Sequence, residues 1–201
     1  MNTEMEIFKK IYLNPGIHIR ALSREMKIGI PSVKYALGKL EKNRLLESRM
    51  EGRNMKFFIN YRNRLAIPYL YAVEYDRLMA LPKNVQQVIS HFMDFFLGGN
   101  AEIPIITIIF GSYAAGNYNE ESDLDVLVVF NDGDAKRVEN IAKIVSSSHS
   151  IDMQPVYMNY EDMHRNFNND FMENVRKNKI IISGLEWWIR LERKSGWNEI
   201  L

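Results

Sequence analysis

One segment, residues 105–130, constrains this chain more than any other part of it: IITIIFGSYAAGNYNEESDLDVLVVF. It begins with an apolar, β-branched run, Ile105–Phe110, which predicts a buried strand. Gly111 and Ser112 follow at once, and the residues after them are typical of a short helix and then a polar loop. Val126–Phe130 is a second apolar run. The segment therefore predicts two buried strands, with polar residues gathered just before the second.

Asp123 and Asp125 stand two positions apart where the second strand begins. Residues two apart in a strand point to one face, so these carboxylates lie about 6–7 Å apart along the backbone, while Leu124 packs inward. Two carboxylates in a dry environment repel each other unless a cation compensates them. Mg²⁺ or Mn²⁺ does this and keeps room for substrate phosphates. A third acid is expected on a neighbouring strand, and Asp152, within the alternating segment 150–158, can supply it.

The glycine and serine after the first strand suit a phosphate group. Gly111 lets the backbone approach a ligand closely, because it has no side chain. The Ser112 hydroxyl and the backbone amides after it can donate hydrogen bonds to phosphate oxygens. Between the second strand and Asp152, residues 134–148 predict a helix with one apolar face. The sequence therefore predicts a phosphate site close to an acidic cation site.

This pattern resembles the signature G-S-x-A-x-G-(x)5-S-D-x-D of the minimal nucleotidyltransferases, which belong to the DNA polymerase beta superfamily and whose relatives include the aminoglycoside nucleotidyltransferases. The resemblance covers residues 84–160 well and the C-terminal tail loosely. The matching positions are Gly111, Ser112, Gly116, Ser122, Asp123 and Asp125. The resemblance implies a nucleotidyltransferase-fold α/β domain with a small mixed sheet.

The resemblance also implies a reaction, the transfer of a nucleoside monophosphate from an NTP to an acceptor, with release of pyrophosphate. The expected nucleotide is ATP, and the expected cofactor is Mg²⁺ or Mn²⁺. By the same resemblance, the metal ligands and catalytic residues are Asp123, Asp125 and Asp152, with Asp152 helping to deprotonate the acceptor. The nucleotide-binding residues are Gly111, Ser112, Gly116 and Ser122. Many family members carry Arg or Lys where this chain has Tyr113 and Ala115, so a positive charge beside the phosphates is missing here.

The charge of the chain is unevenly distributed. Residues 1–64 contain 14 Lys and Arg against 6 Asp and Glu, a balance of +8, and the remaining residues have a balance of −7. Such a division predicts two modules with different partners. A basic small module suits a polyanion, whereas an acidic one can hold carboxylates for a metal.

The basic module predicts three short helices and a β-hairpin. The first two helices are expected at 4–13 and 18–26, and the third is expected to begin near Pro31, with Ser32 as a candidate cap. The hairpin is expected to pair residues 45–50 with residues 55–60. This order resembles the winged helix-turn-helix superfamily, which implies a third helix in a DNA major groove and a hairpin wing on the backbone or in the minor groove. Ser32 and Tyr35 are the candidates for base contact. The candidates for phosphate contact are Lys34, Lys39, Lys42, Arg44, Arg49, Arg53 and Lys56. The alternative is a scaffold for protein docking or for a homodimer.

We expect an α+β chain with a winged helix at 1–62, a helical connector at 63–82 and a minimal nucleotidyltransferase domain at 83–201. In the tail, 160–177 predicts one polar helix. The sequence has no cysteine, no run of about 18 apolar residues for a membrane span and no basic, apolar N-terminal leader, so a cytoplasmic protein without a membrane partner is expected.

Two other functions are compatible with these patterns. The first is a DNA-binding transcriptional regulator whose nucleotidyltransferase-like domain only senses nucleotide. The second is an antitoxin that modifies a separate toxin protein. A pyrophosphate-release assay distinguishes the first from an enzyme, because a sensor binds the nucleotide without cleaving it.

Overall fold

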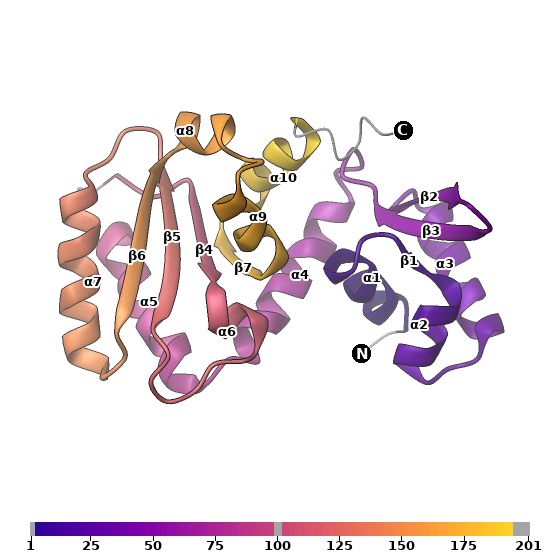
Figure 1. Ribbon diagram of the computed structural model, residues 1–201, viewed down its shortest axis with the longest axis horizontal. Helices are drawn as coiled ribbons and strands as arrows, with labels where there is room; N and C mark the ends of the chain where they lie inside the picture. The colour runs from indigo at the N-terminus through magenta and orange to yellow at the C-terminus, as the bar shows by residue number, and fades with distance from the viewer. Residues whose placement is uncertain (1–2, 99–101, 195–201) are drawn as a thin grey trace. The chain divides into compact units, whose positions relative to one another are not determined.

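The computed structural model describes residues 3–98 and 102–194 (Figure 1). The chain divides into two compact units, Met1–Val73 and Glu74–Leu201, and the division falls within helix α4 (Ala66–Met79). No helix in the described ranges is long and apolar enough to cross a membrane.

The first unit combines three helices with a three-stranded antiparallel sheet of strand order β1-β3-β2. The expected helices and hairpin are present in the expected order. The two-residue strand β1 was not predicted, because so short a segment carries no periodic pattern. The elements are α1 (Thr3–Leu13), β1 (Ile17–His18), α2 (Ile19–Met26), α3 (Ile30–Lys42), β2 (Leu46–Glu51) and β3 (Asn54–Ile59).

Helix α3 buries one apolar face and begins differently from the sequence expectation. Val33, Leu37 and Leu40 recur at helical spacing and are at most 2% exposed. The residue before the helix is Gly29, in extended conformation and without a side-chain cap, and a proline follows in the first turn. The expectation that Ser32 caps the helix is therefore wrong, since Ser32 already lies within its first turn.

The second unit contains a four-stranded mixed sheet of order β6-β5-β4-β7, in which β5 and β6 are parallel and the other pairs are antiparallel. This confirms the small mixed sheet expected from the sequence. After α4 the elements are α5 (Lys83–Leu97), β4 (Ile106–Phe110), α6 (Gly111–Ala115), β5 (Leu124–Phe130), α7 (Ala135–His149), β6 (Met153–Asn159), α8 (Tyr160–Arg165), α9 (Asp170–Lys177), β7 (Lys179–Ser183) and α10 (Leu185–Lys194).

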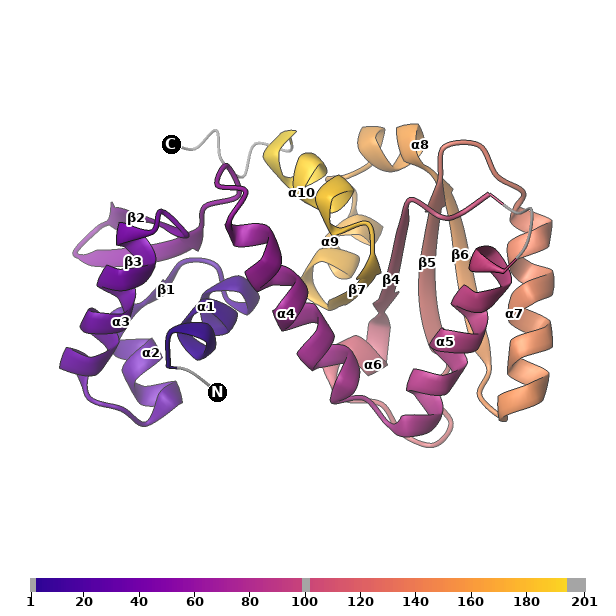
Figure 2. The ribbon, with the colours of Figure 1, turned by 180° about the vertical axis from the view of Figure 1, so that it is seen from behind.

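Helices α5 and α7 pack on one face of this sheet, and Figure 2 shows α5 crossing in front of the strands. Alternate residues of β5, among them Leu124, Val126 and Val128, join the apolar faces of both helices in one core. Helices α8 and α10 contact β5 and β4, respectively. Because both faces of the central strands are covered, β5 is a continuous apolar run, as the sequence pattern indicated.

The tail differs from the single helix expected at 160–177. It forms two helices, α8 and α9, because Asn159 and Asn169 each cap a new helix with a side-chain oxygen. The Asn159 oxygen accepts from the backbone amide of Glu161, and the Asn169 oxygen accepts from that of Met172, both at 2.8 Å. Asparagine competes for backbone donors in this way and favours helix starts over helix interiors.

Candidate active site

The predicted acids lie where β5 and β6 begin side by side. The backbone amide of Leu124 donates to the carbonyl of Asp152 at 2.8 Å, and Asp125 is in register with Gln154 on the parallel neighbour. Leu124 is completely buried, so the strand alternation turns Asp123 and Asp125 away from the core that Leu124 enters. The topology therefore places all three predicted acids at one end of two adjacent strands.

Gly111 lies directly against one of these acids. Its φ of +67° is in the left-handed region, and a Cβ added there would meet Oδ2 of Asp125 at 2.1 Å. Only glycine combines that backbone conformation with such a close approach. Helix α6 begins at Gly111, immediately after β4, so this turn brings the backbone around Ser112 to the carboxylate of Asp125.

The electrostatics of the pair agree with this geometry. Burial raises the pKa of the Asp125 carboxyl above its ordinary value, and the nearby carboxylate of Asp123 raises it further. The pKa of the Tyr113 hydroxyl is raised by burial first, and then by Tyr118 and Asp123. The site therefore concentrates negative charge in a partly dry environment, where a cation is stabilised.

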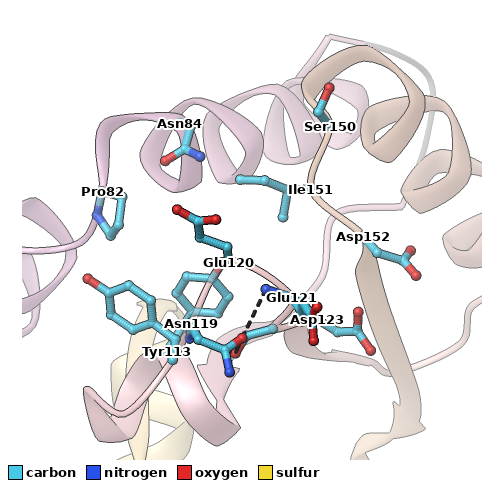
Figure 3. Close-up of a pocket in the computed structure, with 12 residues that line it drawn as sticks. Pro82, Asn84, Tyr113, Asn119, Glu120, Glu121, Asp123, Ser150, Ile151 and Asp152 are labelled. Atoms are coloured by element: carbon cyan, nitrogen blue, oxygen red, sulfur yellow. Dashed lines mark hydrogen bonds between the residues drawn. The ribbon is translucent and has the colours of Figure 1, made fainter.

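A cavity of about 440 Å³ opens beside the acids (Figure 3). In Figure 3, Asp123 and Asp152 lie at one side of this cavity and Pro82 and Tyr113 at the other. Four carboxylates line it, and none of its lining residues is Lys or Arg. The lining residues are Pro82, Asn84, Tyr113, Tyr118, Asn119, Glu120, Glu121, Ser122, Asp123, Ser150, Ile151 and Asp152.

Two tyrosines form an aromatic part of the cavity wall. The rings of Tyr113 and Tyr118 stack with centroids 4.6 Å apart and an angle of 13° between their planes. Tyr113 is only 7% exposed. It lines the cavity, so its hydroxyl can donate a hydrogen bond to a ligand there.

The loop that leads to the acids is held by its own side chains. The amide of Asn119 donates to Oγ of Ser122 at 2.9 Å, and the amide of Glu121 donates to Oδ1 of Asn119 at 2.9 Å. Ser122, predicted to bind nucleotide, thus lines the cavity with its oxygen in the loop network. Gly116 ends helix α6 with a left-handed φ of +76°.

Asp152 is exposed, and its Oδ2 accepts from Nε2 of Gln154 at 3.1 Å. In residues 3–98 and 102–194, no three His, Cys, Asp or Glu side chains are gathered closely enough to enclose a metal ion. The structure thus places Asp125 against Gly111, with Asp123 two residues before it, and Asp152 directly before the adjoining strand β6.

Arg77 does not replace the missing cation at the Gly111 end of helix α6. Arg77 of α4 donates to the carbonyl of Ala114 at 3.4 Å and to that of Lys179, and it pairs with Glu74 at 3.2 Å. These contacts place the guanidinium at the carboxyl end of α6. Arg77 therefore ties α6 to β7 and does not take the place of a phosphate-binding side chain next to Ser112.

Sequence reasoning missed the wall of the cavity opposite the acids. Pro82 and Asn84, at the start of α5, are far from the acids in sequence, and the tyrosines lie in a stretch that suggested only a turn and a polar loop. The only local signal was the density of polar residues at 117–121.

In the first unit, the candidate DNA-contacting residues fall into two groups. Ser32, Lys34, Tyr35, Lys42 and Arg53 are exposed, as is Arg44, and Tyr35 is 69% exposed. The other three are engaged by acids: Lys39 with Glu4 at 2.7 Å, and both Arg49 and Lys56 with Glu51 on the hairpin. Lys56, and then Arg49, hold the pKa of Glu51 below its ordinary value.

Comparison with known proteins finds a match to part of the chain. A family model described as a nucleotidyltransferase domain matches residues 102–182, which include the Gly111–Ser112 turn and all three acids. No curated protein matches the chain. The match supports nucleotidyl transfer as the general chemistry of the second unit.

Proposed function

We propose that the second unit is a metal-dependent nucleotidyltransferase that transfers a nucleoside monophosphate from an NTP, expected to be ATP, to an acceptor hydroxyl. The observation that carries the proposal is the contact between Gly111 and the Asp125 carboxylate, within a region that matches a nucleotidyltransferase domain. That contact places the backbone expected to hold phosphates beside the acids expected to hold metal.

The donors at the site suit Mg²⁺ or Mn²⁺. Carboxylate oxygens are the ligands these ions prefer. Burial, and then the carboxylate of Asp123, raises the pKa of Asp125, and a bound cation would offset both effects. Asp123 and Asp125 would hold the metal, with Asp152 as a further ligand. When bound, such ions stabilise the charge on the entering and leaving oxygens of an in-line displacement.

The protein groups have separate roles in this scheme. Ser112 and the amides after Gly111 bind and orient the triphosphate. Asp152, exposed on the cavity wall, accepts the proton of the acceptor hydroxyl. Gly111 and Ser112, which are assigned to the triphosphate, do not line the cavity. We therefore assign the cavity to the acceptor. Its four carboxylates disfavour an anionic acceptor, and the Tyr113 hydroxyl supplies a hydrogen bond.

The test is pyrophosphate release by the full chain with ATP and Mg²⁺, measured with a panel of neutral, cationic and anionic hydroxyl compounds. Release that depends on one of these acceptors supports the proposal. Tight binding of ATP and Mg²⁺ without release for any acceptor would favour a nucleotide sensor. An acceptor that proves to be a toxin protein would favour the antitoxin alternative.

We propose that the first unit is a winged helix that binds DNA through α3 and the β2–β3 hairpin. The order of helices and strands supports this, as does the row of exposed polar and basic residues on α3. Lys34 and Lys42 would contact phosphates, and Tyr35 would reach base edges.

The Glu51 side chain is expected to weaken this binding, because it neutralises two hairpin cations. Glu51→Gln should raise affinity for duplex DNA roughly threefold to tenfold near 0.1 M salt, and make the slope of log K against log salt steeper by about 1–2. Fluorescence anisotropy across a salt series measures both. Glu47→Gln, on the same strand and with the same change in charge, is the control. Equal effects of both variants would contradict a specific role for Glu51.

A further inference from the structure

Two histidines from different helices meet beside the candidate active site. Nδ1 of His91, on α5, lies 3.0 Å from Nε2 of His149, the last residue of α7. The two rings meet edge to face, with centroids 5.2 Å apart, and the ring of His91 also packs on Phe95. Both histidines are half-buried. This is a hydrogen bond in which one ring donates and the other accepts.

The contact lies at the corner that carries Asp152. Helix α7 ends at His149, and Ser150 takes a left-handed conformation with φ of +54°. Strand β6 begins at Met153, directly after Asp152. A left-handed serine is strained, so other contacts must hold the corner. Oγ of Ser146 accepts from the amide of Met153 at 3.0 Å, and the carbonyl of Asp152 accepts from Leu124.

We infer that His91 and His149 are a positioning pair that fixes this corner, and through it the place of Asp152 beside the acceptor cavity. The inference rests on the proposed nucleotidyltransferase function. Ser150, Ile151 and Asp152 all line the cavity, so a shift at the end of α7 moves a wall of the site directly. The hydrogen bond adds a directional link between α5 and α7, whose other contacts in the core are apolar.

The experiment compares variants that remove the hydrogen bond with variants whose side chains can still form it. His91→Leu and His149→Leu remove it. His91→Asn and His149→Gln keep an amide where Nδ1 and Nε2 stand. We expect the leucine variants to lower kcat roughly tenfold to a hundredfold, with little change in KM for ATP, since small misplacements at an active site have effects of this size. The amide variants should keep most of the wild-type kcat, because they can still join α5 to α7.

A second readout does not depend on turnover. Hydrogen exchange of the backbone amides at 150–153 should be faster in the leucine variants than in the wild type and in the amide variants. His164→Leu, on the exposed side of α8, is the control. Unchanged exchange and kcat in the leucine variants would overturn the inference. If exchange changes as expected but no acceptor gives pyrophosphate, the positioning pair stands and the proposed function fails.

Discussion

Asp125→Asn should lower the rate of pyrophosphate release by at least about a hundredfold. Charge stabilisation by a bound metal is worth several kcal/mol, and each ~1.4 kcal/mol changes a rate tenfold. Asparagine keeps the size of the side chain but loses the charge that holds a cation. Activity is measured at saturating ATP and Mg²⁺ with an acceptor that the wild type uses.

The same substitution should make the metal-free protein more stable at neutral pH. The pKa of Asp125 is raised in the folded state, mainly by burial, so the folded chain keeps this proton to higher pH than the unfolded chain does. The free energy of unfolding therefore falls as the pH rises from the unfolded to the folded pKa. Above that window the ionised carboxylate destabilises the fold, and asparagine removes the effect. The gain should vanish in acid, where both states are protonated.

Denaturant unfolding with and without Mg²⁺ separates these effects. Mg²⁺ should stabilise the wild type and have a smaller effect on the variant, because a ligand that binds only the folded state raises its stability. Asp132→Asn, which changes an exposed acid beyond the other end of β5, is the control and should alter neither property. A variant that loses activity through unfolding, or that Mg²⁺ stabilises as much as the wild type, would contradict the role given to Asp125.

The parts of the site that the sequence predicted are those encoded by neighbouring residues. The alternation around Leu124 placed one residue in the core and turned its two acidic neighbours away from it, because strand geometry leaves no other arrangement when one face is buried. The glycine after β4 indicated a close backbone approach, and the structure places the Asp125 carboxylate there. The charge imbalance indicated two modules, and the chain divides into two compact units.

The remaining features depend on contacts between distant segments. Nothing in the sequence around Pro82 indicates that the start of α5 lines a cavity together with Asp152. The contact of His91 with His149 joins residues 58 positions apart. Likewise, Glu51 lies within the basic hairpin, where its effect on two cations follows from the strand pairing. Tertiary packing decides such contacts, and a single sequence does not specify them.

Gly111→Ala should lower both stability and activity, whereas Gly116→Ala should lower stability by its backbone cost alone. Both glycines have a left-handed φ, so alanine pays a conformational cost at each, about 1–2 kcal/mol. At Gly116 nothing lies within 4 Å of an added Cβ. At Gly111 the Cβ would be 2.1 Å from Oδ2 of Asp125, so the carboxylate must move. We expect a loss of at least about 2 kcal/mol in stability and roughly a hundredfold in activity.

A double-mutant cycle isolates the contact from the backbone cost. In an Asp125→Ser background the carboxylate is absent, so Gly111→Ala should reduce the free energy of unfolding by about as much as Gly116→Ala does. The coupling free energy between two contacting residues is commonly about 0.5–3 kcal/mol, which denaturant unfolding of the four proteins can measure. If Gly111→Ala reduces the free energy of unfolding equally with and without the Asp125 carboxylate, then residue 111 and that carboxylate do not touch in the folded protein. The phosphate-binding turn and the metal-binding acids would then be separate, and the geometry on which the proposed reaction depends would be lost.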